Sequence, residues 1–109
     1  MDHKAPRVNA ARMRSYLGET VRCPCKIKSI NGNRAVVELA DGGDIEVSIS
    51  DDGNIRDKFV EIVGKVETPT TLKMFTALNL GDNIDMAAVN HTIELMHTAV
   101  MAEYWGTKP

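Results

Sequence analysis

The chain has 109 residues and a formal net charge of −2, from 13 basic and 15 acidic side chains. This length predicts one small domain. The slightly acidic balance argues against strong, independent binding to nucleic acid, because proteins that do this are usually strongly basic. No run approaches the ~18 apolar residues of a membrane span, and no apolar stretch follows the charged N-terminus as in a secretory signal. We therefore expect a soluble intracellular protein.

Metal binding is not predicted. Cys23 and Cys25 are the only cysteines, and structural zinc needs four ligands, so we interpret both as core thiols. The acidic turns 41–44 and 51–53 lack the further oxygen ligands of a calcium loop. Neither glycine pattern precedes a helix as a phosphate loop would. We interpret both segments as turns, and we assign no metal-binding or cofactor-binding residue.

Catalysis also finds no support in the sequence. The three imidazoles are His3, His91 and His97, and none has a cysteine or serine partner in the spacing of a nucleophilic pair. A small enzyme would instead need a pocket with perturbed acids, which the sequence does not indicate. We assign no catalytic residue and expect a protein that is not an enzyme.

Residues 10–17 are predicted to form a short helix, begun by Asn9 and ended by Gly18. Five strands follow, in which apolar and polar residues alternate. The positions expected to face the core are Val21, Cys23, Cys25 and Ile27; Ala35, Val37 and Leu39; Ile45, Val47 and Ile49; Val60, Ile62 and Val66; and Leu72, Met74, Leu78 and Leu80. Tyr16 and Phe59 are expected to pack in the core or between helix and barrel. Gly64 interrupts the fourth strand, where a barrel strand would bend.

Five short antiparallel strands with a longer polar connection after the third predict a mainly β protein. An SH3-like barrel would give a similar strand pattern, but the flanking helices favour a five-stranded OB-fold barrel with a short N-terminal helix and a long C-terminal helix. We expect residues 1–82 to form the barrel and its N-terminal helix, with residues 1–8 flexible. Residues 83–109 would be an oligomerisation helix of the same single domain.

The C-terminal helix is predicted as one continuous element, Asp85 to Trp105. One apolar stripe contains Met86, Val89, Ile93, Met96, Val100 and Tyr104, and a second contains Ala88, Thr92, Leu95, Ala99 and Ala102. Together they span roughly 200°, about twice the ~100° of a one-sided surface helix. The remaining face of the helix, with Asn90, His91, Glu94 and Thr98, is predicted to be exposed to water, and His97 borders the first stripe. The helix could be the core helix of a small domain, but the strands already supply a core, so we expect another protein to cover it.

Three segments together resemble a known family. They are residues 6–10, residues 60–66, and the helix opening Asp85-Met86 with Asn90, Ile93, Met96 and His97. They are similar to the smallest subunit of replication protein A, the eukaryotic heterotrimer that binds single-stranded DNA. The loop 41–57 does not match the family residue by residue.

The resemblance implies an OB barrel whose C-terminal helix joins one helix of the middle subunit and one of the large subunit in a three-helix bundle. It also implies a nuclear protein that acts in DNA replication, repair and recombination. On this basis we expect the subunit interface to contain Met86, Val89, Ile93, Leu95, Met96, His97, Ala99, Val100 and Tyr104.

Direct DNA contact by the barrel is expected to be weak. OB folds that hold single strands combine a basic groove with aromatic platforms, and the second and third strands contain no aromatic residue. The candidate contacts are Arg22, Lys26, Lys28, Arg34, Lys73 and Phe75, with Lys65 as a further basic residue. The interpretation that we favour is that these are ordinary solvated strand faces, given the acidic total charge. The alternative function is an OB-fold module that itself contacts single-stranded DNA.

Overall fold

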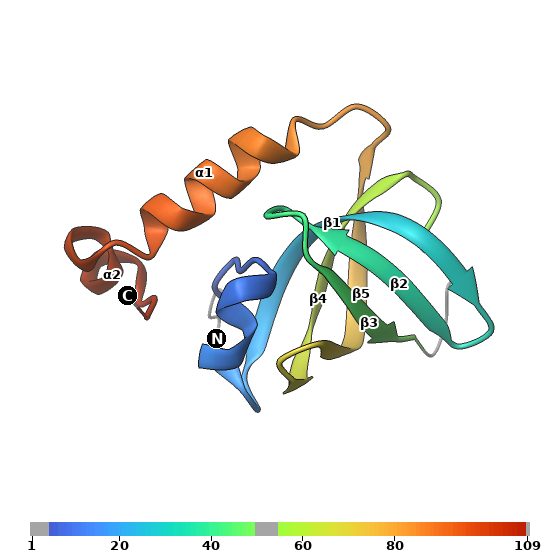
Figure 1. The fold of residues 1–109 in the computed structure, drawn as a ribbon, viewed down its shortest axis with the longest axis horizontal. Helices are drawn as coiled ribbons and strands as arrows, with labels where there is room; N and C mark the ends of the chain where they lie inside the picture. Colours follow the sequence, from blue (N-terminus) through green and yellow to red (C-terminus); the bar gives the residue numbers. More distant parts are fainter. Residues whose placement is uncertain (1–4, 50–54, 109) are drawn as a thin grey trace.

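The computed structural model describes residues 5–49 and 55–108 and shows a closed β-barrel followed by two helices (Figure 1). The elements are the 3-10 helix η1 (Ala10–Tyr16), strands β1 (Thr20–Asn31), β2 (Arg34–Leu39), β3 (Asp44–Ser48), β4 (Phe59–Thr68) and β5 (Thr71–Gly81), and helices α1 (Met86–Met96) and α2 (Ala99–Trp105). The predicted mainly β protein with five strands in a closed sheet is confirmed. No helix within the described residues is long and apolar enough to cross a membrane.

The barrel closes in the order β1-β2-β3-β5-β4. Four of the five pairings are antiparallel, but β3 and β5 run in parallel. The prediction of purely antiparallel strands is therefore wrong at this pair. The reason is that β4 lies beyond β5 in the strand order and runs opposite to β3, so β5, which is antiparallel to β4, lies beside β3 in the same direction.

The interior is filled by the apolar side chains of alternate strand positions. The fully buried ones include Val21, Cys23, Cys25, Ala35, Val37, Val47, Val60, Ile62, Val66 and Leu72. Tyr16 and Phe59 are also buried, as predicted. Both cysteines are free thiols, and burial raises the pKa of Cys25 to about 12 and that of Cys23 well above its ordinary value.

The strand β5 contains a bulge that reverses its inward and outward faces. Met74 pairs with Gly64 and Thr76 pairs with Val63, so Phe75 is an extra residue without a partner across the ladder. Beyond the bulge Ala77 packs against the core and Leu78 is 59% exposed. The prediction that Leu78 faces inward is wrong, because one inserted residue moves every following side chain to the other face.

Gly64 lies beside this bulge, where β4 and β5 approach closely. A Cβ atom at this position would lie 2.3 Å from the carbonyl oxygen of Lys73 and 3.1 Å from Cγ of Leu72. Strand β4 continues through Gly64 without the predicted interruption, but the backbone of β5 approaches this position too closely for any side chain.

The segment before η1, expected to be flexible, pairs with β1 where the structure describes it. The Val8 amide donates to the Arg22 carbonyl oxygen at 2.9 Å, and the Arg22 amide donates to the Pro6 carbonyl oxygen at 2.8 Å. Val8 is fully buried. The segment 5–8 therefore belongs to the folded unit.

The short N-terminal helix is confirmed as the 3-10 helix η1, and two side chains cap it. The Asn9 side-chain oxygen accepts a hydrogen bond from the Arg12 backbone amide at 3.2 Å. Asp41, in the turn between β2 and β3, accepts from the amides of Ala10 and Ala11 at 3.2 and 3.0 Å. The acidic turn 41–44 thus binds the start of η1, whereas the turn 51–53 lies outside the described residues.

The single long C-terminal helix predicted from the sequence is wrong, because the chain turns between α1 and α2 (Figure 1). Thr98 has an extended backbone, with φ −67° and ψ 155°, and its side chain caps α2 by accepting from the Met101 amide. The Thr107 hydroxyl donates to the Met96 carbonyl oxygen at the end of α1. These side chains bond the backbone groups that a helix break leaves unpaired, which stabilises the break.

Candidate subunit interface

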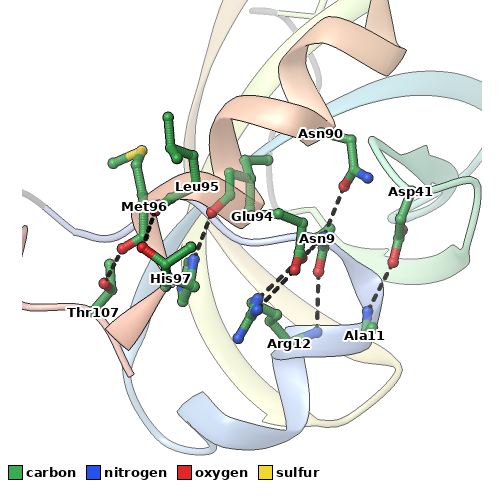
Figure 2. Close-up of polar contacts among 12 residues, drawn as sticks. Asn9, Ala11, Arg12, Asp41, Asn90, Glu94, Leu95, Met96, His97 and Thr107 are labelled. Carbon is green, nitrogen blue, oxygen red and sulfur yellow. Dashed lines mark hydrogen bonds and ion pairs between the residues drawn. The ribbon is translucent and has the colours of Figure 1, made fainter. Parts of the chain in front are cut away.

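Helix α1 is held against η1 by a cluster of polar side chains (Figure 2). The side-chain nitrogen Nδ2 of Asn9 donates to Oδ1 of Asn90 at 2.8 Å and to Oε2 of Glu94 at 2.7 Å. The Arg12 guanidinium binds both oxygens of Glu94, at 3.0 and 2.7 Å. The Arg12 hydrogen bond lowers the pKa of Glu94 to about 2. The prediction that Asn90 and Glu94 face water is therefore wrong, because η1 supplies polar partners for them.

His97 fastens the end of α1 to Tyr16. Its Nδ1 lies 2.8 Å from the Ile93 carbonyl oxygen, which can only accept, so Nδ1 carries the proton. In the neutral ring Nε2 then accepts from the Tyr16 hydroxyl at 2.9 Å. The Tyr16 oxygen in turn accepts from the Lys108 amide at 2.9 Å. Burial lowers the pKa of His97, which keeps the imidazole neutral in this chain of hydrogen bonds.

Between the helices and the outer surface of β1, β4 and β5 runs a series of three hollows that share lining residues. We call it the helix groove. Its volumes are about 260, 490 and 330 Å³. It is lined by Leu78, Leu80, Ile84, Val89, Thr92 and Ile93 at one end, by Leu95, Met96 and Met101 in the middle, and by Tyr104, Trp105 and Thr107 at the other end. The bulge in β5 supplies Leu78 to this surface.

The floor of the helix groove carries charge. Arg7 donates through Nε to Glu61 at 2.7 Å, and the Glu61 side chain is almost fully buried. Arg22 donates through Nε to the carbonyl oxygen of Ala5 at 2.7 Å. Burial and the neighbouring Arg7 lower the pKa of Arg22. Sequence periodicity could not identify this floor, because Arg7 and Arg22 become neighbours only when the N-terminal segment pairs with β1.

The residues predicted for the subunit interface divide into two groups. Ile93, Met96 and His97 are buried within this chain, and Met86 and Val89 are half-buried. The remaining four are exposed: Leu95 at 50%, Val100 at 85%, Tyr104 at 77%, and Ala99. The turn at Thr98 removes Val100 and Tyr104 from the stripe of Ile93. The exposed apolar surface therefore lies on both helices rather than along one seam.

The residues predicted to contact DNA do not form one patch. Lys28 pairs with Asp44 at 2.9 Å and Arg34 with Glu46 at 3.1 Å on the outer face of β1, β2 and β3. The hydrogen bond to Asp44 raises the pKa of Lys28. These carboxylates oppose the positive charge that a phosphate backbone would need.

The other candidate DNA contacts are spread around the barrel. Lys26 is half-buried beside Phe59 and Glu38. Lys73 lies opposite Lys65 across β4 and β5, and Phe75 at the bulge is 56% exposed. Arg22 lies in the helix groove, away from Lys28 and Arg34. Within residues 5–49 and 55–108, no group of three or more His, Cys, Asp or Glu side chains could hold a metal ion.

The closed five-stranded barrel with its strand order, N-terminal helix and following C-terminal helices defines an OB-fold protein. The sequence profile of the family described as replication factor A protein 3 matches residues 1–102. The chain therefore belongs to this family, as its resemblance to the smallest subunit of replication protein A predicted. No curated protein sequence matches the chain.

Solved structures share the fold at low sequence identity. A chain of U. maydis replication protein A bound to single-stranded DNA is 22% identical, with a TM-score of 0.85 over 96% of this chain and 98% of that one. A chain of yeast replication protein A bound to single-stranded DNA is 14% identical, with a TM-score of 0.66 over 88% and 94%. The S. pombe telomere capping protein Ten1 is 10% identical, with a TM-score of 0.70 over 84% and 96%.

Proposed function

We propose that this chain is a structural subunit of a nuclear heterotrimer of the replication protein A type, which binds single-stranded DNA in replication, repair and recombination. Its C-terminal helices would join helices of the middle and large subunits in a three-helix bundle. The chain itself would have no enzymatic activity and would need no cofactor. Its role would be to nucleate and hold the assembly.

The observation that carries this proposal is the exposed apolar surface on α1 and α2. Leu95, Val100 and Tyr104 are 50%, 85% and 77% exposed, and Trp105 is 47% exposed beside Tyr104. The two rings meet edge to face, with centroids 5.3 Å apart. Aromatic and aliphatic side chains exposed together on adjacent helices are typical of a surface that a partner covers. The family membership supports the identity of the partners.

Purification of the tagged chain from its own cells tests this proposal. We expect it to copurify with two larger chains, and native mass spectrometry should give one copy of each. The double variant Leu95→Asp/Val100→Asp should no longer copurify with the two larger chains, because each new carboxylate would be buried in the interface without a partner. Both positions are exposed in the isolated chain, so its fold should persist. Ile93→Asp would be a poorer test, because Ile93 is already fully buried here.

Ile30→Asp is the matched control, since Ile30 is an exposed apolar residue at the far end of β1. It should copurify normally. A wild-type chain that purifies alone as a monomer would contradict the proposal.

The second candidate function is an OB-fold module that contacts single-stranded DNA itself. Its support is the similarity of this chain's fold to chains of replication protein A solved bound to single-stranded DNA. Two observations argue against strong contact with DNA. Lys28 and Arg34 are already paired with carboxylates, and β2 and β3 contain no aromatic residue. DNA affinity of the isolated chain at two salt concentrations separates the two functions, because phosphate contacts produce a steep salt dependence.

A further inference from the structure

Arg22 lies on the charged floor of the helix groove, and within residues 5–49 and 55–108 it forms no ion pair. Its only hydrogen bond from the side chain within the described residues is to the Ala5 carbonyl oxygen. In this part of the chain no carboxylate forms an ion pair with it, whereas Arg7 beside it is paired with Glu61. Glu61 attracts Arg22 electrostatically but forms its ion pair with Arg7, so the two arginines share one carboxylate. A half-buried guanidinium without a carboxylate of its own is unfavourable, because its lost hydration is only partly offset by opposite charge.

The walls around Arg22 fit the apolar face of a helix. Arg22, Met96 and Trp105 together line two neighbouring hollows of the helix groove, and Leu95 and Met101 extend the apolar surface in one of them. The hollows form a series with shared lining residues, so the groove is elongated. An elongated groove with apolar walls is the shape that an amphipathic helix recognises, through residues at spacings of three and four, and Arg22 adds a polar anchor on its floor.

We propose that the helix groove accepts an amphipathic helix of a partner subunit, which places a carboxylate opposite Arg22 and apolar side chains against Leu95 and Trp105. This inference rests on the proposed function, and it adds the chemistry of the partner and the residue that selects it. The planar guanidinium matches a carboxylate with two parallel hydrogen bonds. Arg22 would thereby fix the register of the partner helix, while the apolar contacts would supply the buried surface area that stabilises binding.

A single-stranded nucleic acid is the less favoured occupant. Phosphate binding along a strand requires several free cations, but Glu61 already compensates Arg7 at the groove floor. Apolar side chains also form most of the lining of the middle hollow, namely Leu95, Met96, Met101 and Trp105. Charge complementarity and wall composition therefore both favour a helix that carries one carboxylate.

The test measures how tightly this subunit binds in the intact heterotrimer. Arg22→Gln removes the charge but retains an N–H donor for the Ala5 carbonyl, and Arg22→Glu reverses the charge. We expect the affinity for the partner subunits to fall at least about tenfold with glutamine and further with glutamate, because a desolvated carboxylate would lose its partner. Arg14→Glu on η1 is the control, since Arg14 is exposed and lines none of the three hollows.

A photo-crosslinking amino acid at Thr92 tests the same site with Arg22 unchanged. Thr92 lines the groove, and Ala87, on the same helix outside it, is the matched control. Crosslinks from position 92 should reach a partner peptide with Asp or Glu within one helical turn, and position 87 should not reach that peptide. If Arg22→Gln lowers thermal stability, these crosslinks decide the question, and a peptide without a nearby acid would overturn the inference.

Two further results would also overturn it. Equal binding of wild type and Arg22→Glu would show that Arg22 faces no carboxylate, while assembly through the helices would stand. Normal assembly of Arg22→Gln with weaker binding of the complex to single-stranded DNA would assign Arg22 to a phosphate contact instead. If the wild-type chain does not assemble at all, the proposed function fails before this inference is reached.

Discussion

Tyr16 and His97 lie 81 positions apart in the sequence and are joined by a buried hydrogen bond of 2.9 Å between Oη and Nε2. Their rings meet edge to face, with centroids 5.9 Å apart at an interplanar angle of 84°. The Lys108 amide donates to the same tyrosine oxygen. One side chain of η1 therefore holds the end of α1 and the segment that follows α2, and this arrangement sets the position of the exposed apolar surface.

Tyr16→Phe should loosen the C-terminal helices from the barrel. The substitution leaves Nε2 of His97 and the Lys108 amide without their partner, at a cost of about 1–3 kcal/mol. Hydrogen exchange should become faster in α1 and α2, while β2 and β3 keep their protection. Tyr104→Phe is the control, since Tyr104 is 77% exposed. Unchanged exchange in Tyr16→Phe would show that the hydroxyl contributes nothing to the attachment.

Lowering the pH from 7 to 5 should reduce the free energy of unfolding, in part through His97. Burial lowers the pKa of His97 below its ordinary value of 6.5. Below pH 6.5 the unfolded chain gains a proton that the folded chain resists. The contribution of His97 to the free energy of unfolding is therefore fully present above pH 6.5 and is lost as the pH falls towards the lower pKa of His97 in the folded state.

Urea unfolding at several pH values measures this effect. The His97→Gln variant should have a smaller pH dependence between pH 7 and 5 than wild type. His91→Gln replaces an exposed histidine of the same helix and should retain the wild-type slope. Equal slopes for wild type and His97→Gln would rule out His97 as the titrating group.

Gly64→Ala and Gly64→Val should both destabilise the barrel by about 1–3 kcal/mol, through overpacking and displacement of β5. The first added carbon already meets the Lys73 carbonyl oxygen at 2.3 Å, so both variants should show a loss in denaturant unfolding. If Gly64 lay in a regular strand with open space beside it, both variants would instead be more stable than the wild type, because alanine and especially valine suit strands better than glycine. Stability that rises from glycine through alanine to valine would contradict the close approach.

Phe75→Ala should reduce the affinity of the complex for a long single strand by less than the ~1–3 kcal/mol of one stacked base. Phe75 is exposed at the β5 bulge, but no other aromatic side chain lies on β1, β2, β3 or β5 to continue a platform. A loss equal to that of a stacking platform, measured by fluorescence anisotropy, would place Phe75 in the DNA path.

Replacing Lys26, Lys28 and Lys73 together with glutamine should change the salt dependence of DNA binding by less than one unit. Each direct phosphate contact contributes a little under one unit to that slope, and Lys28 is already paired with Asp44. A loss of two or three units would show that these lysines neutralise phosphates and would favour the DNA-binding alternative.

Local patterns in the sequence were sufficient for the barrel. Alternation places Val21, Cys23 and Cys25 inside because a strand presents successive side chains to opposite faces, and the structure buries all three. The same rule failed at Leu78, because a bulge depends on how β4 meets β5 at Gly64 and not on the residues of β5 alone. The predicted helix also failed at Thr98, because the break is stabilised by polar contacts of Thr98 and Thr107 with helix-end backbone groups, which the spacing of apolar residues does not show.

The sequence by itself determined the strand number, the core positions ahead of the β5 bulge, the cap at Asn9 and the surplus of apolar helix surface, since each depends on residue types at short spacing. Only the tertiary structure decided which apolar residues remain exposed. It brings Asn9 and Arg12 to Glu94, Tyr16 to His97, and Arg7 to Arg22. These contacts join segments far apart in the chain, and their energies depend on burial and partner geometry, which periodicity does not contain.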